Sequence, residues 1–120
     1  MTVRTLYTLL SEKISPILSE LWDNDGLMCC PDPEKDVCKV LFTLDVTDAV
    51  VDRALETKVD VIVSHHPLVF SKLSSLTVDT PVGKRLIRLA CAGVSVFSFH
   101  TRFDRVEGGS SLITAYFCMA

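Results

Sequence analysis

The most hydrophobic stretches of the chain are short continuous runs, which predict buried strands. Three of them are strong, at residues 37–45, 59–63 and 94–99, and a weaker one lies at 27–30. A run of this length between polar residues is typical of a strand that is buried on both faces, as in a parallel sheet. These runs therefore predict the strands of a central sheet.

Between these runs, apolar residues recur with the three- and four-residue spacing of an amphipathic helix. This spacing occurs at residues 3–14, 47–57 and 81–90. A threonine that can cap the first turn stands at the start of each segment, namely Thr2, Thr47 and Thr80. The order strand, helix, strand, helix, strand implies right-handed crossovers between parallel strands. We predict an α/β fold with a mainly parallel sheet, in a single domain over residues 1–120.

The remaining segments have the composition of turns and loops. Residues 21–26 are rich in Asp, Asn and Gly, so Asp23 and Asn24 are interpreted as turn formers and Trp22 as a packing residue. Two further segments are predicted to be irregular, residues 31–36 and 67–75.

Overall composition is that of an ordinary folded domain. Apolar residues make up 48% of the 120-residue chain and charged residues 22%, with a net charge of −3. The twelve Lys and Arg residues are scattered, which disfavours a nucleic-acid surface. No apolar stretch approaches the ~20 residues that span a bilayer. The N-terminus lacks the apolar core of a signal peptide, so we expect a cytoplasmic protein.

Cysteine usage points to reduced thiols. The count of five is odd, and no C-x-x-C spacing occurs among Cys29, Cys30, Cys38, Cys91 and Cys118. We expect buried, reduced cysteines, as in a cytosolic protein. A zinc site built from Cys29, Cys30 and Cys38 is the alternative, which their spacing disfavours.

All three histidines of the protein follow predicted strands. His65 and His66 come directly after one strand, and His100 comes directly after the last, with Asp104 four residues further on. In an open parallel sheet the carboxyl ends of the strands meet at one edge, where ligands bind. Imidazole nitrogens together with a carboxylate suit zinc, iron, manganese or nickel. The sequence therefore predicts a divalent metal site at this edge.

The adjacent pair His65-His66 leaves several arrangements open. Neighbouring side chains on an extended backbone point to opposite sides, so both reach one ion only if the chain turns before Pro67. Alternatively, each histidine serves a different ion of a dinuclear pair that a carboxylate bridges, as in two-metal hydrolytic sites. A structural pair with hydrogen-bonded imidazoles is the third interpretation.

Three other polar residues lie near these clusters. Asp45 ends a predicted strand, where it either belongs to the site or interacts favourably with the dipole of the next helix. Glu107 is either an additional acid or ligand, or a solvated loop carboxylate. Arg102 either pairs with an anionic substrate or, in the simpler interpretation, lies at the surface. Asp45 and Glu107 are the candidates for orienting a nucleophilic water.

Four short motifs follow one another along the chain, namely Leu21-Trp22-Asp23-Asn24-x-Gly26-Leu27, Thr43-Leu44-Asp45-Val46-Thr47, Ser64-His65-His66-Pro67-Leu68-Val69-Phe70, and His100-Thr101-x-x-Asp104 with Gly108-Gly109. Together they resemble the Nif-three-like dinuclear metal centre proteins, also called GTP cyclohydrolase I type 2 homologues. The motifs are specific as a set, although no single one is.

This resemblance implies a three-layer α/β fold and a ring-shaped homo-hexamer with metal pairs facing an internal cavity. It implies that His65, His66 and Asp104 are metal ligands, with Asp104 bridging two ions. His100 would then lie near the site without being a core ligand. The name of the family implies hydrolytic opening of a purine ring by a metal-bound hydroxide.

The last residues depart from the pattern of that family. Its members complete the site with a His and a Glu from a later segment, and residues 110–120 contain no His, Asp or Glu. We interpret 110–120 as an atypical, truncated tail, and expect three protein ligands to hold one ion with water in the open positions. A metal-dependent hydrolase is the leading hypothesis, and a non-catalytic metal-binding scaffold or interaction protein competes with it. A nucleotide-binding module is disfavoured, because no phosphate loop is present.

Overall fold

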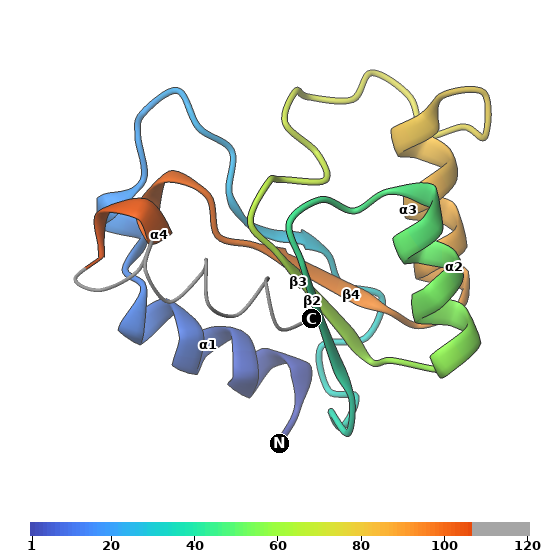
Figure 1. Cartoon of the computed structure of the whole chain (residues 1–120), viewed down its shortest axis with the longest axis horizontal. Helices are drawn as coiled ribbons and strands as arrows, with labels where there is room; N and C mark the ends of the chain where they lie inside the picture. The colour runs from blue at the N-terminus through green and yellow to red at the C-terminus, as the bar shows by residue number, and fades with distance from the viewer. Residues whose placement is uncertain (107–120) are drawn as a thin grey trace.

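The chain folds around a four-stranded sheet, as seen in a computed structural model that describes residues 1–106 (Figure 1). The strands lie in the order β1-β4-β3-β2. β2, β3 and β4 are parallel, and β1 runs antiparallel to β4 at one edge. Their bounds are Gly26–Cys29 for β1, Val40–Thr43 for β2, Val61–Ser64 for β3 and Ser95–Ser98 for β4. The predicted α/β fold with a mainly parallel sheet is confirmed.

Helices lie on both faces of this sheet. The helix α1 (Val3–Lys13) lies on one side, and α2 (Asp48–Thr57) and α3 (Pro81–Cys91) lie together on the other (Figure 1). As predicted, a threonine hydroxyl caps each of the three by accepting a hydrogen bond from a backbone N–H in the first turn. Two short elements complete the described chain, the 3-10 turn η1 (Pro16–Leu18) and the helix α4 (Thr101–Arg105).

The two faces of the sheet carry separate apolar clusters. On β3, Ile62 packs into the cluster under α2 and α3, whereas its neighbours Val61 and Val63 pack into the cluster under α1. Val96 and Phe97 on β4 divide in the same way. Successive side chains on a strand point to opposite faces, so a central strand buried on both faces must be apolar throughout. This requirement explains the continuous hydrophobic runs in the sequence.

The second strand is shorter than the predicted segment 37–45. The backbone N–H of Val37 donates to the carbonyl of Met1, and those of Cys38 and Lys39 donate to the carboxylate of Asp60. These donors therefore have partners outside the sheet, and β2 begins only at Val40. The apolar pattern cannot reveal where backbone donors find their acceptors.

The antiparallel edge strand β1 sets the geometry of the site. Because β1 runs against β4, the segment 19–25 that enters β1 lies beside the residues that leave β4. Gly26 begins β1 with φ of 110°, and a Cβ there would lie 2.7 Å from the hydroxyl of Tyr7 and 3.0 Å from Nη2 of Arg102. Only glycine combines this backbone conformation with so close an approach.

Candidate metal centre

Parallel strand pairing brings the two histidine motifs together. The hydroxyls of Ser64 and Ser98, the last residues of β3 and β4, are hydrogen-bonded at 2.8 Å. The backbone N–H groups of His65 and His66 donate to carbonyls at the end of β2, at 3.2 and 2.9 Å. His65 and His66 therefore continue the sheet edge, and His100 leaves the neighbouring strand at the same level.

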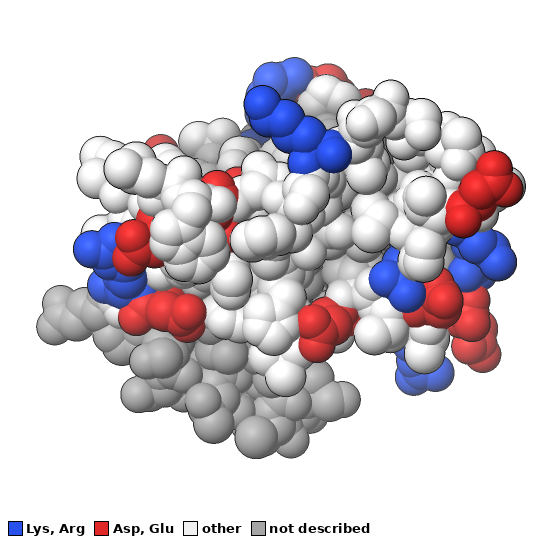
Figure 2. Space-filling view, turned by 90° about the horizontal axis from the view of Figure 1, so that it is seen from above, with Lys and Arg blue, Asp and Glu red and all other residues white. Residues whose placement is uncertain are grey.

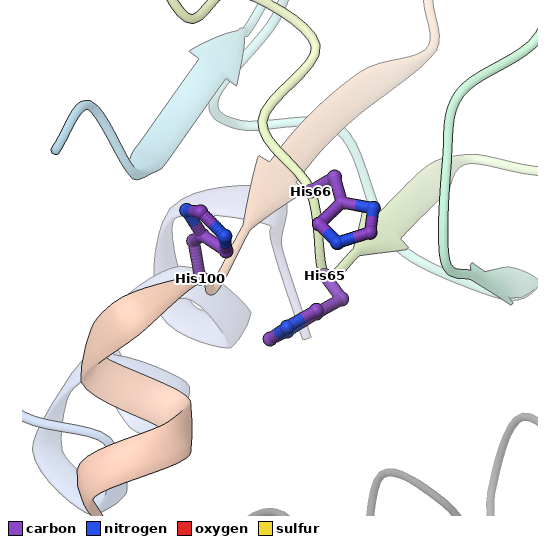
Figure 3. A group of neighbouring side chains, drawn as sticks. All are labelled: His65, His66 and His100. Atoms are coloured by element: carbon purple, nitrogen blue, oxygen red, sulfur yellow. The ribbon is translucent and has the colours of Figure 1, made fainter.

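The three histidines form one cluster between the end of β3 and the start of α4 (Figure 3). One ring nitrogen from each of His65, His66 and His100 lies within 4.8 Å of the other two. Ring centroids are 5.0 Å apart for His65 and His66, 5.2 Å for His65 and His100, and 5.5 Å for His66 and His100. Both adjacent histidines thus approach a common third one, so the chain does turn before Pro67.

In each histidine, Nδ1 faces an oxygen atom. The carbonyl of Phe99 lies 3.0 Å from Nδ1 of His65. Asp45 Oδ1 lies 2.7 Å from Nδ1 of His66, and Asp23 Oδ1 lies 3.1 Å from Nδ1 of His100. A carbonyl or an ionised carboxylate only accepts hydrogen bonds, so Nδ1 carries the proton and Nε2 of the neutral ring keeps its lone pair. This donor set fits a metal ion, because metal-binding histidines almost always donate their second N–H in this way.

Asp104 stands at the edge of the cluster. It lies on α4, one helical turn after His100, and its Oδ1 is 3.6 Å from Nε2 of His65. Its side chain is 48% exposed, whereas that of His65 is only 12% exposed. Burial lowers the pKa of His65, although the carboxylate of Asp104 opposes the shift. The lowered pKa favours the neutral imidazole, which is the form that binds metal.

The acidic segment 19–25, which is far from α4 in sequence, supplies the groups that cap the first turn of α4. His100 at the start of α4 makes no capping hydrogen bond through its own side chain. Instead, its backbone N–H donates to Asp25, and the backbone N–H and hydroxyl of Thr101 both donate to Asp23 Oδ2. Burial on its own raises the pKa of Asp23, but the hydrogen bonds from Thr101 and His100 outweigh it and the pKa is lowered.

Three interpretations from the sequence are corrected here. Asp23 is not simply a turn former, since its side chain is fully buried against His100 and Thr101. Arg102 is not at the surface: it is 1% exposed, with Nε 3.3 Å from Asp25 Oδ2 and its guanidinium over the ring of Phe99. Trp22 is not packed in the core, because it is 63% exposed. The Asp-x-Asp spacing of Asp23 and Asp25, which puts two carboxylates on one side wherever a backbone is extended, was the available signal.

Trp22 instead stands at the rim of the cluster. Its ring meets the ring of His100 edge-on at 6.3 Å and that of the half-exposed Phe70 at 6.4 Å. The face seen from above carries intermixed positive and negative side chains around a central area of uncharged ones (Figure 2). Asn24 ties the two loops that bear these aromatic rings, because its side-chain amide donates to the carbonyl of Val69.

Asp45 belongs to the histidine cluster rather than to the helix that follows it. Its carboxylate is engaged by His66, while Thr47 caps α2. Glu107, Gly108-Gly109, Cys118 and the tail 110–120 lie outside the described residues.

Cysteine burial departs from the expectation. Within residues 1–106, Cys29, Cys30, Cys38 and Cys91 are free thiols, and both Cys38 and Cys91 are exposed. The expectation of burial is therefore wrong for these two, and Cys29 and Cys30 are only partly buried. Over the same range, the groups of residues placed to hold a metal ion include no cysteine. The alternative zinc site thus gains no support.

Comparison with known proteins identifies the family of this chain. The model of the family Duf34/NIF3 (NGG1p interacting factor 3) matches residues 1–117. The chain belongs to the Duf34/NIF3 family. A GTP cyclohydrolase 1 type 2 homolog of Clostridium perfringens is 42% identical over 99 residues, which cover 82% of this chain and 37% of that protein. The NIF3 homolog of Schizosaccharomyces pombe is 37% identical over 97 residues, which cover 79% and 35%.

Solved structures agree with this membership of the Duf34/NIF3 family. A Staphylococcus aureus protein superimposes with a TM-score of 0.87 at 33% identity, covering 97% of this chain and 37% of the other. A Bacillus cereus protein related to NIF3 gives 0.83 at 30% identity, covering 91% and 30%. The chain thus spans about a third of the length of these relatives. The resemblance read from the motifs is confirmed at the level of family and fold.

Within residues 1–106, no helix is long and apolar enough to cross a membrane. The cytoplasmic location, the hexamer and the single-domain organisation stay predictions.

Proposed function

We propose that this Duf34/NIF3 chain binds a divalent metal ion through His65, His66 and Asp104 and acts as a metal-dependent hydrolase. Zinc, iron, manganese and nickel suit two imidazoles combined with a carboxylate. The hydrolase part rests on relatives named GTP cyclohydrolase 1 type 2 homologs, and it concerns the class of reaction only.

One observation carries the metal-binding part: Nδ1 of each ligand histidine already has an oxygen partner. The carbonyl of Phe99 holds Nδ1 of His65, and Asp45 holds Nδ1 of His66. These contacts fix each ring and leave Nε2 as the atom with a free lone pair. Asp45 is therefore a positioning residue in this proposal, since its carboxylate acts on the ion through His66.

The location of the cluster supports a reaction site as well as a binding site. It lies at the carboxyl ends of three parallel strands, where open α/β sheets bind their ligands. A divalent ion bound there supplies Lewis-acid activation for hydrolysis. Asp104 and His66 are both about half exposed, which gives solvent and substrate access to the same edge.

Metal content is the first test. Wild-type protein, His65→Ala/His66→Ala and Asp104→Ala are loaded with zinc, dialysed and measured by elemental analysis. Asp36→Ala is the matched control for Asp104, since Asp36 is an exposed carboxylate outside the cluster. We expect near-stoichiometric zinc in the wild type and the control, less in Asp104→Ala and none in the double variant. Metal-free wild-type protein with a native circular dichroism spectrum contradicts the proposal.

The hydrolase part needs its own measurement. Metal-loaded wild-type protein is incubated with GTP, and product formation is followed by chromatography beside His65→Ala. We expect turnover that disappears in the variant. Stoichiometric metal without turnover contradicts the hydrolase part and leaves metal binding in place.

A further inference from the structure

We propose that His100 is a third imidazole ligand of the same ion and that the buried carboxylate of Asp23 positions it. This inference rests on the proposed function, and it differs from the implication of the family motifs that His100 only lies nearby. It makes the segment 19–25, far from the histidine motifs in sequence, a part of the metal centre.

The position of the His100 ring is the first observation. One of its nitrogens lies within 4.8 Å of a nitrogen of His65 and of His66. Ligand nitrogens around a tetrahedral zinc ion lie about 3.4 Å apart, because each Zn–N bond is about 2.0–2.1 Å. Side-chain adjustments of about an ångström therefore suffice to bring the three nitrogens to one ion.

The contacts of Asp23 are the second observation. Its side chain is fully buried, and its two oxygens divide their roles. Oδ2 accepts from the backbone N–H and the hydroxyl of Thr101, whereas Oδ1 faces Nδ1 of His100 at 3.1 Å. Because the ionised carboxylate only accepts, it selects the tautomer of His100 with the proton on Nδ1. Nε2 of that tautomer is then available as a ligand.

The surroundings hold this pair in place. The backbone N–H of Glu20 donates to the hydroxyl of Thr101 at 2.9 Å. The segment 19–25 and the start of α4 therefore each donate a hydrogen bond to the other. The ring of Trp22 stands edge-on to that of His100 at 82°. With Asp23 at Nδ1 and Trp22 against the ring, rotation of the imidazole is restricted. A preorganised ring loses less conformational freedom when it binds a metal ion.

Ring tautomers test the positioning role without any metal. Long-range ¹H–¹⁵N spectra of metal-free protein are recorded at a pH where the histidines are neutral, and His100→Gln assigns its signals. We expect the proton of His100 on Nδ1 in the wild type and a shift towards the Nε2–H form in Asp23→Ala. An Nε2–H form of His100 in the wild type overturns the positioning role. This test uses wild-type protein, so it does not depend on whether an Asp23 variant folds.

Cobalt binding tests the ligand role. Wild-type protein, His100→Gln, Asp23→Asn and Thr101→Val are titrated with Co²⁺, whose visible absorption reports the number and geometry of its ligands. We expect His100→Gln to lose the wild-type spectrum and at least 10-fold in affinity, and Asp23→Asn to lose about 10–100-fold. Thr101→Val is the comparison variant, since it removes the hydrogen bonds of the hydroxyl with Asp23 and Glu20 but keeps the contact of Asp23 with the ring. It should lose less affinity for Co²⁺ than Asp23→Asn does.

The outcomes separate this inference from the proposed function. Wild-type cobalt binding with an unchanged spectrum and affinity in His100→Gln overturns the third ligand alone. A wild-type protein that binds no cobalt overturns the proposed function and this inference together. Equal losses in Thr101→Val and Asp23→Asn, with an unchanged His100 tautomer in both, assign Asp23 to the structure of α4 and overturn its positioning role.

Discussion

Two carboxylates at opposite ends of the sheet show how similar hydrogen bonding serves different purposes. At the amino end of β3, Asp60 accepts from the backbone N–H groups of Cys38 and Lys39, and its other oxygen pairs with Lys35 at 3.2 Å. At the carboxyl end, Asp23 accepts from the backbone N–H of Thr101, and its other oxygen faces His100. Each carboxylate accepts hydrogen bonds from backbone N–H groups that have no acceptor within a helix or a strand.

The difference lies in the last partner. An ammonium group has hydrogen-bond donors but no lone pair. The ion pair between Asp60 and Lys35 therefore offers no ligand atom and serves only to stabilise the fold. An imidazole has a second nitrogen, so the contact of Asp23 with Nδ1 of His100 leaves the lone pair of Nε2 free. A carboxylate that accepts from backbone donors therefore completes a structural contact at one end of the sheet, whereas at the other end we propose that it prepares a metal ligand.

Removing the charge of Asp25 should cause the greatest loss of stability. Asp25 is 4% exposed and faces the 1% exposed Arg102, so Asp25→Asn leaves a buried guanidinium without a counter-charge. We expect a loss of about 3–5 kcal/mol in urea-induced unfolding, typical of breaking one side of a buried ion pair.

A double variant supplies the control for that loss. Asp25→Asn/Arg102→Met removes both charges, and it should be more stable than the sum of the two single variants predicts. Additive losses would show that the two side chains do not interact energetically.

Asp60→Asn should cause a smaller loss at the other end of the sheet. Hydrogen bonds to a charged group contribute about 1.5–3 kcal/mol, and the amide that replaces the carboxylate cannot accept the same set. Chemical unfolding at neutral pH measures this effect. Zinc content should match that of the wild type, and a parallel loss of zinc would erase the contrast between the two ends.

The contribution of Asp60 should also depend on pH. Burial raises its pKa, but the backbone N–H groups of Cys38 and Lys39 and the ammonium of Lys35 outweigh this effect, so the pKa is lowered. A carboxyl with a lowered folded-state pKa stabilises above its unfolded pKa of about 4, and that stabilisation is lost as pH falls through the folded-state value. The difference between wild type and Asp60→Asn should therefore be full at pH 7 and shrink in acid. A gap that persists at low pH argues against the charge as its source.

Lys35→Met should have the smallest effect. The lysine side chain is 32% exposed, and partly exposed ion pairs contribute about 0–1 kcal/mol. Thermal unfolding of this variant beside Asp60→Asn separates the ion pair from the backbone hydrogen bonds. A loss as large as that of Asp60→Asn would assign the stabilisation to Lys35 instead.

Much of the fold was predictable because it follows from local periodicity. The helix at 3–14, the capping threonines and the central strands were all predicted from spacing, and the structure places them with shifts of a few residues. The helix α4 was missed because it is a five-residue element whose first turn is capped by Asp23 and Asp25. Those caps lie more than 70 residues away in sequence, beyond the reach of any local pattern.

In the candidate site, too, local patterns predicted some features, whereas contacts between distant residues decided the others. The sequence placed His65, His66 and His100 at the ends of neighbouring strands, and the structure brings their rings together. Their roles as ligands, with Asp104, stay predictions. Asp23 was interpreted as a turn former, because its contact with His100 depends on the antiparallel direction of β1.

By itself, the sequence determined the family, the mainly parallel α/β sheet and the edge at which the histidines gather. Hydrophobic periodicity is a local property, and strand ends in a parallel sheet share an edge whatever the loops do. Only the tertiary structure decided which oxygen faces each Nδ1, and that Arg102 is buried against Asp25. Such contacts join residues distant in sequence, so they exist only once β1 has paired with β4 and carried its acidic segment to the start of α4.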